Sequence, residues 1–298
     1  MSKRLRNALS ETLPPQSLAH VYNSYDIVGD IAIIRLTEAS EECCLEIADA
    51  VMKVHKNVKT VLAQTSPVHG DFRLRRFKFV AGENGTVTTH RERGCLFLVD
   101  VEKVYFSPRL SHERMRIAKQ VGNGEVVLNM FAGAGCFSIL IAKYSKAEKV
   151  YSIDVNPSAV RYMQENIRLN GVYGRVSSML GDAQEIVERN LRRIADRVLM
   201  PLPEKAFEYL PHALSALKKA GGWVHYYDFE YGKKKEDAIE RVRLRVSERF
   251  QSLGAAFQIR FGRVVRATGP NWYQVVLDIE VSEPRTANNK CGFNERVL

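Results

Sequence analysis

The chain has 298 residues, of which 45% are hydrophobic, so it can build one large domain or two ordinary domains around a buried core. Lysine and arginine number 44 against 34 acidic residues, and the formal net charge of +10 favours a polyanionic partner, with a generally basic surface as the simpler alternative. The apolar runs are too short for a membrane span and the first residues lack the apolar core of a signal peptide, so we expect a soluble, cytoplasmic protein.

The five cysteines do not suggest a disulfide or metal framework. They occur at positions 43, 44, 95, 136 and 291, and none forms a Cys-x-x-Cys pair or a Cys/His cluster with ligand spacing. We therefore expect reduced thiols and no metal site. The chemistry has to come from other residue types.

The first 105 residues combine short alternating segments with one helical segment, which indicates a small α+β module. Apolar and polar residues alternate over 22–36, a helical pattern follows from about Glu41 to His55, and strand-like residues occupy 60–65. Further strands are predicted at 75–82, 85–94 and 95–107.

From Ser111 onward, predicted helices alternate with predicted strands. Helices are expected at 111–120, 136–144, 157–169, 183–193, 204–219 and 234–252, and strands at 125–130, 149–153, 175–180, 196–200 and 222–228. Two closing strands, 256–264 and 272–281, predict an antiparallel hairpin at the edge of the sheet. Such alternation is typical of a doubly wound α/β fold with a mostly parallel sheet. We divide the chain into residues 1–105 and 106–298.

The segment VLNMFAGAGCFSI, residues 127–139, predicts a strand, a turn of small residues and the start of a helix. In doubly wound sheets a ligand binds outside the carboxyl end of the first strand, which is where this turn lies. Gly133 and Gly135 would let a ligand approach the backbone, and the helix N-terminus would offer free N–H groups. A tight turn needed only for packing is the structural alternative.

Two acidic residues after the next strands favour a ligand that contains adenosine. Asp154 ends the second strand about 20 residues after the glycines, where a carboxylate suits a ribose diol. Asp182 follows the third strand and could accept a hydrogen bond from an adenine amino group. The sequence lacks a third glycine with dinucleotide spacing and a phosphate-binding P-loop motif, so S-adenosylmethionine fits better than NAD or ATP.

With these motifs the chain resembles the archaeal and eukaryotic tRNA (guanine-37-N1)-methyltransferases. These are class I methyltransferases with a Rossmann-like fold, related to the aminocarboxypropyl transferases of the wybutosine pathway. The similarity extends in order through almost the whole chain, with matching segments at 70–83, 104–118, 129–139, 151–160, 165–172, 196–206 and 221–229. The resemblance implies S-adenosyl-L-methionine as cofactor and the anticodon stem-loop of tRNA as partner, and we expect a monomer.

The resemblance assigns the catalytic roles to Glu113 and Arg73. Guanine N1 must lose its proton before it attacks the sulfonium methyl group, and a carboxylate can accept that proton as a general base. A guanidinium group near O6 would stabilise the negative charge that develops there. The residues alone leave alternatives open, because Glu113 also fits the first turn of a helix and Arg73 a phosphate-contacting surface.

The other site residues divide between cofactor and substrate. We expect the cofactor to contact Phe131, Ala132, Gly133, Gly135, Asp154, Val155, Asp182, Ala183 and Pro201. We expect the substrate to contact Tyr105, Arg109, Arg114, Pro201, Leu202 and Pro203. Tyr105, Phe106 and Tyr226 could stack on a splayed base or belong to the core.

One departure from the family concerns the loop after the fourth strand, which usually reads Asn-Leu-Pro and here reads Pro201-Leu202-Pro203. Proline has no N–H to donate to a base edge. The change resembles the archaeal subgroup that methylates carbon 7 of the wyosine precursor 4-demethylwyosine, to give isowyosine. We therefore expect N1-methylguanosine, the methylated precursor, or both. We also expect that the family's elbow-gripping N-terminal domain is missing, so that recognition depends on residues 1–105.

Two other functions remain open. Aminocarboxypropyl transfer uses the same cofactor, although the segment SPRLSHER fits that group less well. A non-catalytic RNA-binding scaffold is the second, and Asp154 and the glycine turn argue against it. Arginines and aromatic residues interleave at 73–79, 90–94, 109–116 and 260–274, as RNA-binding surfaces often do, whereas the lysines at 233–235 are expected to be a solvated tip.

Overall fold

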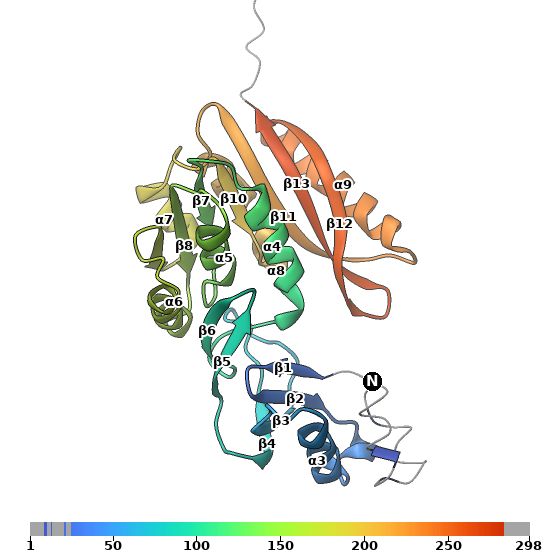
Figure 1. Cartoon of the computed structure of the whole chain (residues 1–298). Helices are drawn as coiled ribbons and strands as arrows, with labels where there is room; N and C mark the ends of the chain where they lie inside the picture. Colours follow the sequence, from blue (N-terminus) through green and yellow to red (C-terminus); the bar gives the residue numbers. More distant parts are fainter. Residues whose placement is uncertain (1–8, 11–12, 14–20, 22–24, 283–298) are drawn as a thin grey trace, which may run out of the picture.

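The computed structural model describes residues 9–10, 13, 21 and 25–282, and it places a small N-terminal module beside a larger sheet flanked by helices (Figure 1). Residues 22–24 of the predicted segment 22–36, and Cys291, lie outside the described residues. No helix within the described ranges is long and apolar enough to cross a membrane.

The N-terminal module is a four-stranded sheet with one main helix. Its strands lie in the order β1 (Asp26–Val28), β2 (Ile31–Arg35), β3 (Thr60–Gln64) and β4 (Phe77–Gly82). The pair β2 and β3 is parallel and therefore needs a crossover, which the short η1 (Glu38–Ser40) and α3 (Cys44–Val54) provide. Helix α3 buries Ile47, Ala48, Ala50 and Val51 against this sheet. The predicted α+β module is confirmed.

A two-stranded hairpin, β5 (Val87–Glu92) and β6 (Cys95–Asp100), connects this module to the rest. Strand β6 is fixed to helix α6 (Pro157–Leu169) by two asparagines, one in the helix and one directly after it, since the backbone N–H groups of Leu98 and Leu96 donate to Asn166 and Asn170. The predicted strand 95–107 ends at Asp100 because the carboxylate of Asp100 accepts the N–H of Glu102 and starts a turn. The division of the chain at residue 105 stays a prediction.

The large sheet has seven strands in the order β12, β13, β11, β10, β7, β8, β9. The parallel strands are β7 (Val126–Asn129), β8 (Lys149–Asp154), β9 (Val176–Leu180), β10 (Arg197–Met200) and β11 (Gly221–Tyr231). The hairpin of β12 (Ala256–Gly269) and β13 (Trp272–Ser282) joins antiparallel to β11. This arrangement confirms the predicted doubly wound α/β fold with an edge hairpin.

Six helices cover the two faces of the large sheet (Figure 1). One face packs against α4 (Ser111–Gln120), α5 (Cys136–Tyr144) and α6 (Pro157–Leu169). The other packs against α7 (Ala183–Asn190), α8 (Pro203–Ala216) and α9 (Lys235–Ser252). Successive strand residues alternate between these two cores, as the pleat requires: Tyr227 of β11 belongs to the first and Tyr226 to the second.

Local sequence explains where these elements begin and end. Helix α6 starts where Asn156 accepts the N–H of Ser158 and Pro157 occupies the first helical position. Helix α7 ends three residues earlier than predicted, and Arg193 after it has a left-handed backbone, with φ of 57°. Strand β12 runs five residues longer than predicted, through bulges that keep it paired with β13.

Candidate functional site

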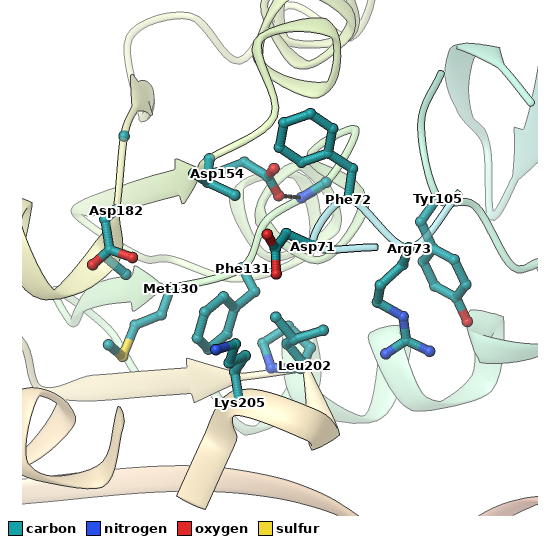
Figure 2. A pocket seen from close by; sticks show the side chains of 15 residues that line it. Asp71, Phe72, Arg73, Tyr105, Met130, Phe131, Asp154, Asp182, Leu202 and Lys205 are labelled. Carbon is teal, nitrogen blue, oxygen red and sulfur yellow. Dashed lines mark hydrogen bonds between the residues drawn. The ribbon is translucent and has the colours of Figure 1, made fainter. Parts of the chain in front are cut away.

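A cavity of about 350 Å³ opens at the carboxyl ends of the parallel strands, where one module faces the other (Figure 2). In Figure 2 the acidic Asp154 and Asp182 lie on one side of it, and Arg73 and Tyr105 on the other. Its lining consists of Asp71, Phe72, Arg73, Tyr105, Met130, Phe131, Gly133, Asp154, Val155, Gly181, Asp182, Ala183, Pro201, Leu202 and Lys205. Pockets at this edge are the usual ligand sites of open α/β sheets.

The glycine turn after β7 is held by the carboxylate at the end of β8. The backbone N–H of Gly133 donates to Asp154 Oδ2 at 2.6 Å, and that of Asn156 donates to Oδ1 at 2.9 Å. Gly133 has a φ of 55°, a left-handed conformation that glycine adopts without strain. Burial raises the pKa of the Asp154 carboxyl, and the two backbone donors only partly oppose this shift. The remaining lone pairs of Asp154 can accept hydroxyl groups from a ligand.

Asp182 forms the next part of the same wall. It caps α7 by accepting the N–H of Gln184 at 2.7 Å, and its other oxygen accepts the hydroxyl of Tyr209 at 2.5 Å. Burial and this bond to Asp182 raise the pKa of Tyr209 well above its ordinary value, so the phenol stays a donor. The ring of Tyr209 meets that of Phe131 edge-on, with centroids 5.2 Å apart, which fixes the floor of the cavity.

The opposite wall comes from a closed loop of the N-terminal module. His69 and Leu74 pair through their backbones, and the N–H of Arg73 donates to Gly70, so the tip of the loop presents Asp71, Phe72 and Arg73 to the cavity. Arg73 has a φ of 56°, which is rare for a residue with a side chain. Backbone strain of this kind clusters at functional sites.

The Arg73 guanidinium is held across the cavity. It donates to Glu204 in the first turn of α8 at 2.5 Å and lies over the rings of Tyr105, at 4.6 Å, and Phe229, at 5.7 Å. Its buried Nε has no hydrogen-bond partner within the described part of the chain. An unsatisfied buried donor is costly, so this group is suited to a ligand acceptor.

Three arginines surround Tyr105. Arg266 of β12 donates to its hydroxyl at 3.0 Å, and the guanidinium groups of Arg73 and Arg75 lie near its ring. Burial opposes ionisation of Tyr105, but the nearby Arg266 and Arg73 outweigh it and lower the pKa of its phenol. Guanidinium groups therefore cluster around Tyr105 on this side of the cavity.

Glu113 does not line the cavity in this structure. Its side chain is 1% exposed, and its carboxylate accepts bonds from Arg116, Arg263 and the Tyr227 hydroxyl, the last at 2.8 Å. Arg116 also bridges to Asp278. Burial alone would raise the pKa of the Asp278 carboxyl, but its bonds to His225 and Arg116 outweigh burial and lower that pKa. The predicted base is thus one end of a buried, ion-paired network.

Several other predicted site residues do not line the cavity. Arg109 donates to Asp26 of β1 at 2.7 Å, and Arg114 is buried against Glu92 at 2.5 Å, so both connect elements of the fold. Ala132 is buried in the glycine turn, Gly135 precedes α5 with a φ of 84°, and Pro203 occupies the start of α8. Their ligand contacts stay predictions.

The structure adds lining residues that the sequence analysis did not single out, namely Asp71, Phe72, Met130, Gly181 and Lys205. Each is next to or within a few residues of a predicted one, so adjacency was the available signal. The side chains of Asp71 and Lys205 come from a loop and a helix whose approach to the cavity depends on tertiary packing. Sequence periodicity does not report such an approach.

Comparison with known proteins gives consistent matches over most of the chain. The model of the TRM5/TYW2 methyltransferase domain matches residues 88–254, and that of the TYW2 N-terminal domain matches residues 5–85. The chain is 44% identical to tRNA (guanine(37)-N(1))-methyltransferase Trm5b of Pyrococcus abyssi, over 90% of this chain and 78% of that protein. It is 38% identical to tRNA 4-demethylwyosine(37)-methyltransferase Taw21 of Saccharolobus solfataricus, over 90% of this chain and 97% of that protein.

A further relative is the tRNA(Phe) (4-demethylwyosine(37)-C(7)) aminocarboxypropyltransferase of Methanocaldococcus jannaschii, 34% identical over 85% of this chain and 96% of that protein. Among solved structures, Trm5b from Pyrococcus abyssi superposes with a TM-score of 0.82 at 42% identity, covering 95% of this chain and 82% of that chain. The complex of aTrm5 with tRNALeu superposes with a TM-score of 0.80 at 33% identity, covering 95% of this chain and 79% of that chain.

The structure of P. horikoshii TYW2 in complex with MeSAdo superposes with a TM-score of 0.75 at 31% identity, covering 95% of this chain and all of that one. These relatives include both methyl and aminocarboxypropyl transferases. A family model that covers more than half of the chain, together with relatives above 30% identity, decides the assignment. The chain belongs to the TRM5/TYW2 methyltransferase family.

Proposed function

We propose that this chain transfers the methyl group of S-adenosylmethionine to the purine at position 37 of tRNA. The product would be N1-methylguanosine, the C7-methylated form of 4-demethylwyosine, or both. The observation that carries this proposal is a single cavity whose one wall suits an adenosine-containing cofactor and whose other wall presents Arg73 and Tyr105 to a base. The names of the methyltransferase relatives support the same substrate position.

The cofactor wall has the donors and acceptors that S-adenosylmethionine needs. Asp154 keeps free lone pairs toward the cavity for ribose hydroxyls, and Asp182 can accept from the adenine amino group. Phe131 and Val155 line the same wall and offer apolar contact to the adenine ring. When bound, the cofactor supplies an electrophilic methyl group, and the task of the protein is alignment and proton transfer.

On the substrate wall we assign anion stabilisation to Arg73. Deprotonation of guanine N1 places negative charge on O6, and the unpaired Nε of Arg73 can donate to that atom. Its contacts with Tyr105 and Glu204 fix the guanidinium before substrate arrives, which is what electrostatic preorganisation requires. Pro201 and Leu202 add an apolar edge that suits a flat base, including the larger tricycle.

Two carboxylates are candidates for accepting the N1 proton. Glu113 carries the role by family resemblance, but it can accept a proton from the substrate only if one of its present donors moves away. Arg263, whose side chain is 36% exposed, is the donor freest to do so. Asp71 already lines the cavity. We assign the role of proton acceptor to Glu113, and Asp71 is the alternative acceptor against which this assignment is tested.

The test uses two tRNA substrates with methyl-labelled S-adenosylmethionine, one carrying guanosine at position 37 and one carrying 4-demethylwyosine. Nucleoside mass spectrometry of the products then identifies the modified atom. Methyl on the guanosine alone would place the chain with the N1 enzymes, and methyl on the tricycle would connect Pro201 with altered base choice. Absence of any methylated product on both substrates would contradict the proposal.

Aminocarboxypropyl transfer is the second candidate. The match of residues 5–85 to the TYW2 N-terminal domain favours it, as does the aminocarboxypropyl transferase relative. Repeating the experiment with cofactor labelled in its aminocarboxypropyl group separates the two, because aminocarboxypropyl transfer would then label the tricycle and the methyl label would not. We further propose that the chain acts as a cytoplasmic monomer, and sedimentation of the purified protein tests the oligomeric part.

A further inference from the structure

An exposed aromatic pair lies beyond the cavity, at the end of β11. Tyr231 is directly opposite Trp272 of β13, and their rings meet edge-on with centroids 5.9 Å apart. Trp272 is 49% exposed and Tyr231 37% exposed. Large aromatic side chains at this exposure leave a ring face open to solvent, and neither residue takes part in the cavity chemistry.

This pair continues a row of side chains that passes the catalytic candidates. Alternate residues of a strand point to the same face, so Tyr227, Phe229 and Tyr231 share one face of β11. Tyr227 donates to Glu113, and the ring of Phe229 faces the guanidinium of Arg73. Two strand residues span about 7 Å, so the aromatic pair lies one such step beyond the Arg73 contact.

The pair is held rigidly beside a lysine-rich loop. The backbone N–H of Gly232 donates to the carbonyl of Asn271 at 3.0 Å, which ties this loop to the turn between β12 and β13. A Cβ on Gly232 would lie 2.7 Å from the backbone N of Ala238, so the tight path requires glycine. Exposed lysines follow at 233–235, and Asp237 accepts the backbone N–H of Lys234 as a helix cap. In Figure 1 the β12–β13 turn lies at the end of the large sheet that faces the N-terminal module.

We propose that Tyr231 and Trp272 form a stacking platform for an unpaired nucleotide next to the target base, with Lys233 contacting its phosphate. Aromatic faces beside positive charge are the usual means of binding unpaired nucleotides, and stacking tolerates any base. The lysines favour RNA over a protein partner at this face because they complement phosphate charge. The inference rests on the proposed function, since it takes the substrate to be an RNA loop.

The first test uses fluorescence, because the chain contains only two tryptophans, Trp223 and Trp272. In the full-length Trp223→Phe variant, Trp272 is the sole indole, and we expect an anticodon stem-loop RNA to quench its emission at saturation. The matched Trp272→Phe variant retains Trp223, at the other end of β11, and its emission should not change. Equal quenching of both variants, or of neither, would overturn the platform.

The second test measures RNA affinity and turnover together. We expect Trp272→Ala to raise the Kd for the stem-loop about tenfold and to raise KM more than it lowers kcat, while Trp272→Phe retains most of the affinity. Tyr173→Ala, which removes an aromatic ring that is 79% exposed elsewhere, is the control and should match the wild type. Lys233→Ala should reduce the salt dependence of binding by about one phosphate contact.

The outcomes distinguish this inference from the proposed function. If the wild type modifies tRNA and Trp272→Ala behaves like Tyr173→Ala, the platform is wrong and the proposed function stands. If the wild type neither binds nor modifies tRNA, both are wrong. If Trp272→Ala instead changes the sedimentation of the protein alone, the face is a self-association surface and the platform is again wrong.

Discussion

Glu113 has the most demanding environment among the candidate catalytic residues, since two guanidinium groups and a phenol contact one buried carboxylate. We predict that Glu113→Gln lowers the rate of methyl transfer by about 10²–10⁴-fold, because the amide cannot accept the N1 proton. Cofactor affinity should stay unchanged, since Glu113 does not line the cavity. Single-turnover kinetics and calorimetry with S-adenosylmethionine measure the two quantities.

The Asp71→Asn variant provides the comparison for this result. It neutralises a carboxylate that lines the cavity and leaves the buried network intact. If Asp71→Asn loses the rate and Glu113→Gln keeps it, the proton goes to Asp71 and the assignment is wrong. A thermal melt of each variant shows whether the loss reflects folding, since Glu113→Gln removes the anion that pairs with Arg263 and leaves Arg116 with Asp278 alone.

A second residue-scale prediction concerns Asp154. The Asp154→Asn change keeps one oxygen for the Gly133 N–H but removes the charge that would strengthen bonds to ribose hydroxyls. We expect cofactor affinity to fall about 10- to 100-fold, as for loss of a charged hydrogen bond. Calorimetric titration tests this, with Glu165→Gln on α6 as a control that should bind like the wild type. Equal affinity of the two variants would place the ribose elsewhere.

The sequence predicted the position of some of these residues and missed that of others, for a physical reason. Asp154 ends β8 and Asp182 follows two residues after β9, and the carboxyl ends of parallel strands meet at one edge, so their position follows from order along the chain. Asp71 reaches the cavity only because the N-terminal module packs against the large domain. The burial of Glu113 depends on β11 and β12, which lie more than a hundred residues further along the chain.

At the scale of elements, the contact between the β5–β6 hairpin and α6 depends on two asparagines. Asn166 is fully buried and makes three bonds to backbone groups, with the N–H of Leu98 at 2.7 Å, the carbonyl of Leu98 at 3.1 Å and the carbonyl of Ala134 at 3.0 Å. Asn166→Ala would leave these buried groups unpaired. We expect it to lower the free energy of unfolding by about 2–4 kcal/mol.

Urea denaturation of the full chain measures this effect. Arg168→Ala is the control on the same helix, since its side chain is exposed and its pair with Glu165 lies at the surface. Surface ion pairs contribute little, so we expect a change below about 1 kcal/mol. Equal destabilisation of the two variants would mean that the hairpin is held by apolar burial and that the asparagine bonds contribute little.

The order of elements was predictable because hydrophobic periodicity changes from the strand to the helix pattern at nearly every boundary. The end residues of the elements were less predictable, since they depend on contacts with other parts of the chain. Strand β6 stops where Asp100 caps a turn, and β12 continues because bulges keep it paired with β13. The asparagines of α6 gave no signal, because a buried asparagine and an exposed one look alike in a polar helix pattern.

At the scale of the whole molecule, polar contacts connect the N-terminal sheet to the rest of the chain. The N–H of Gly29 donates to His90 Nδ1 at 3.1 Å, the N–H of Asp30 donates to the Thr88 hydroxyl at 3.1 Å, and Arg109 bonds to Asp26. These contacts position the loop that carries Arg73 over the cavity, so the geometry of the site depends on them. The sequence predicted both modules, but a turn meeting a distant strand has no periodic pattern that would reveal it.

The contact at His90 predicts a dependence of stability on pH. Burial and the Arg114 guanidinium lower the pKa of His90 from 6.5 to about 4, so the folded chain holds the imidazole neutral while the unfolded chain protonates near its ordinary pKa. The stabilisation is complete above about pH 6.5 and is lost as the pH falls toward 4, by up to about 3 kcal/mol. His90→Asn keeps an acceptor for the N–H of Gly29 and does not titrate.

We therefore expect the free energy of unfolding of His90→Asn, measured by urea denaturation at a series of pH values, to fall less steeply than that of the wild type between pH 6.5 and 4. His112→Asn, at an exposed position on α4, is the control and should follow the wild-type curve. Because the N-terminal sheet carries Arg73, methyl transfer at pH 5 should also be better preserved in His90→Asn. Parallel curves for wild type and His90→Asn would show that His90 is protonated in the folded chain and that the attachment of the module does not depend on its neutral form.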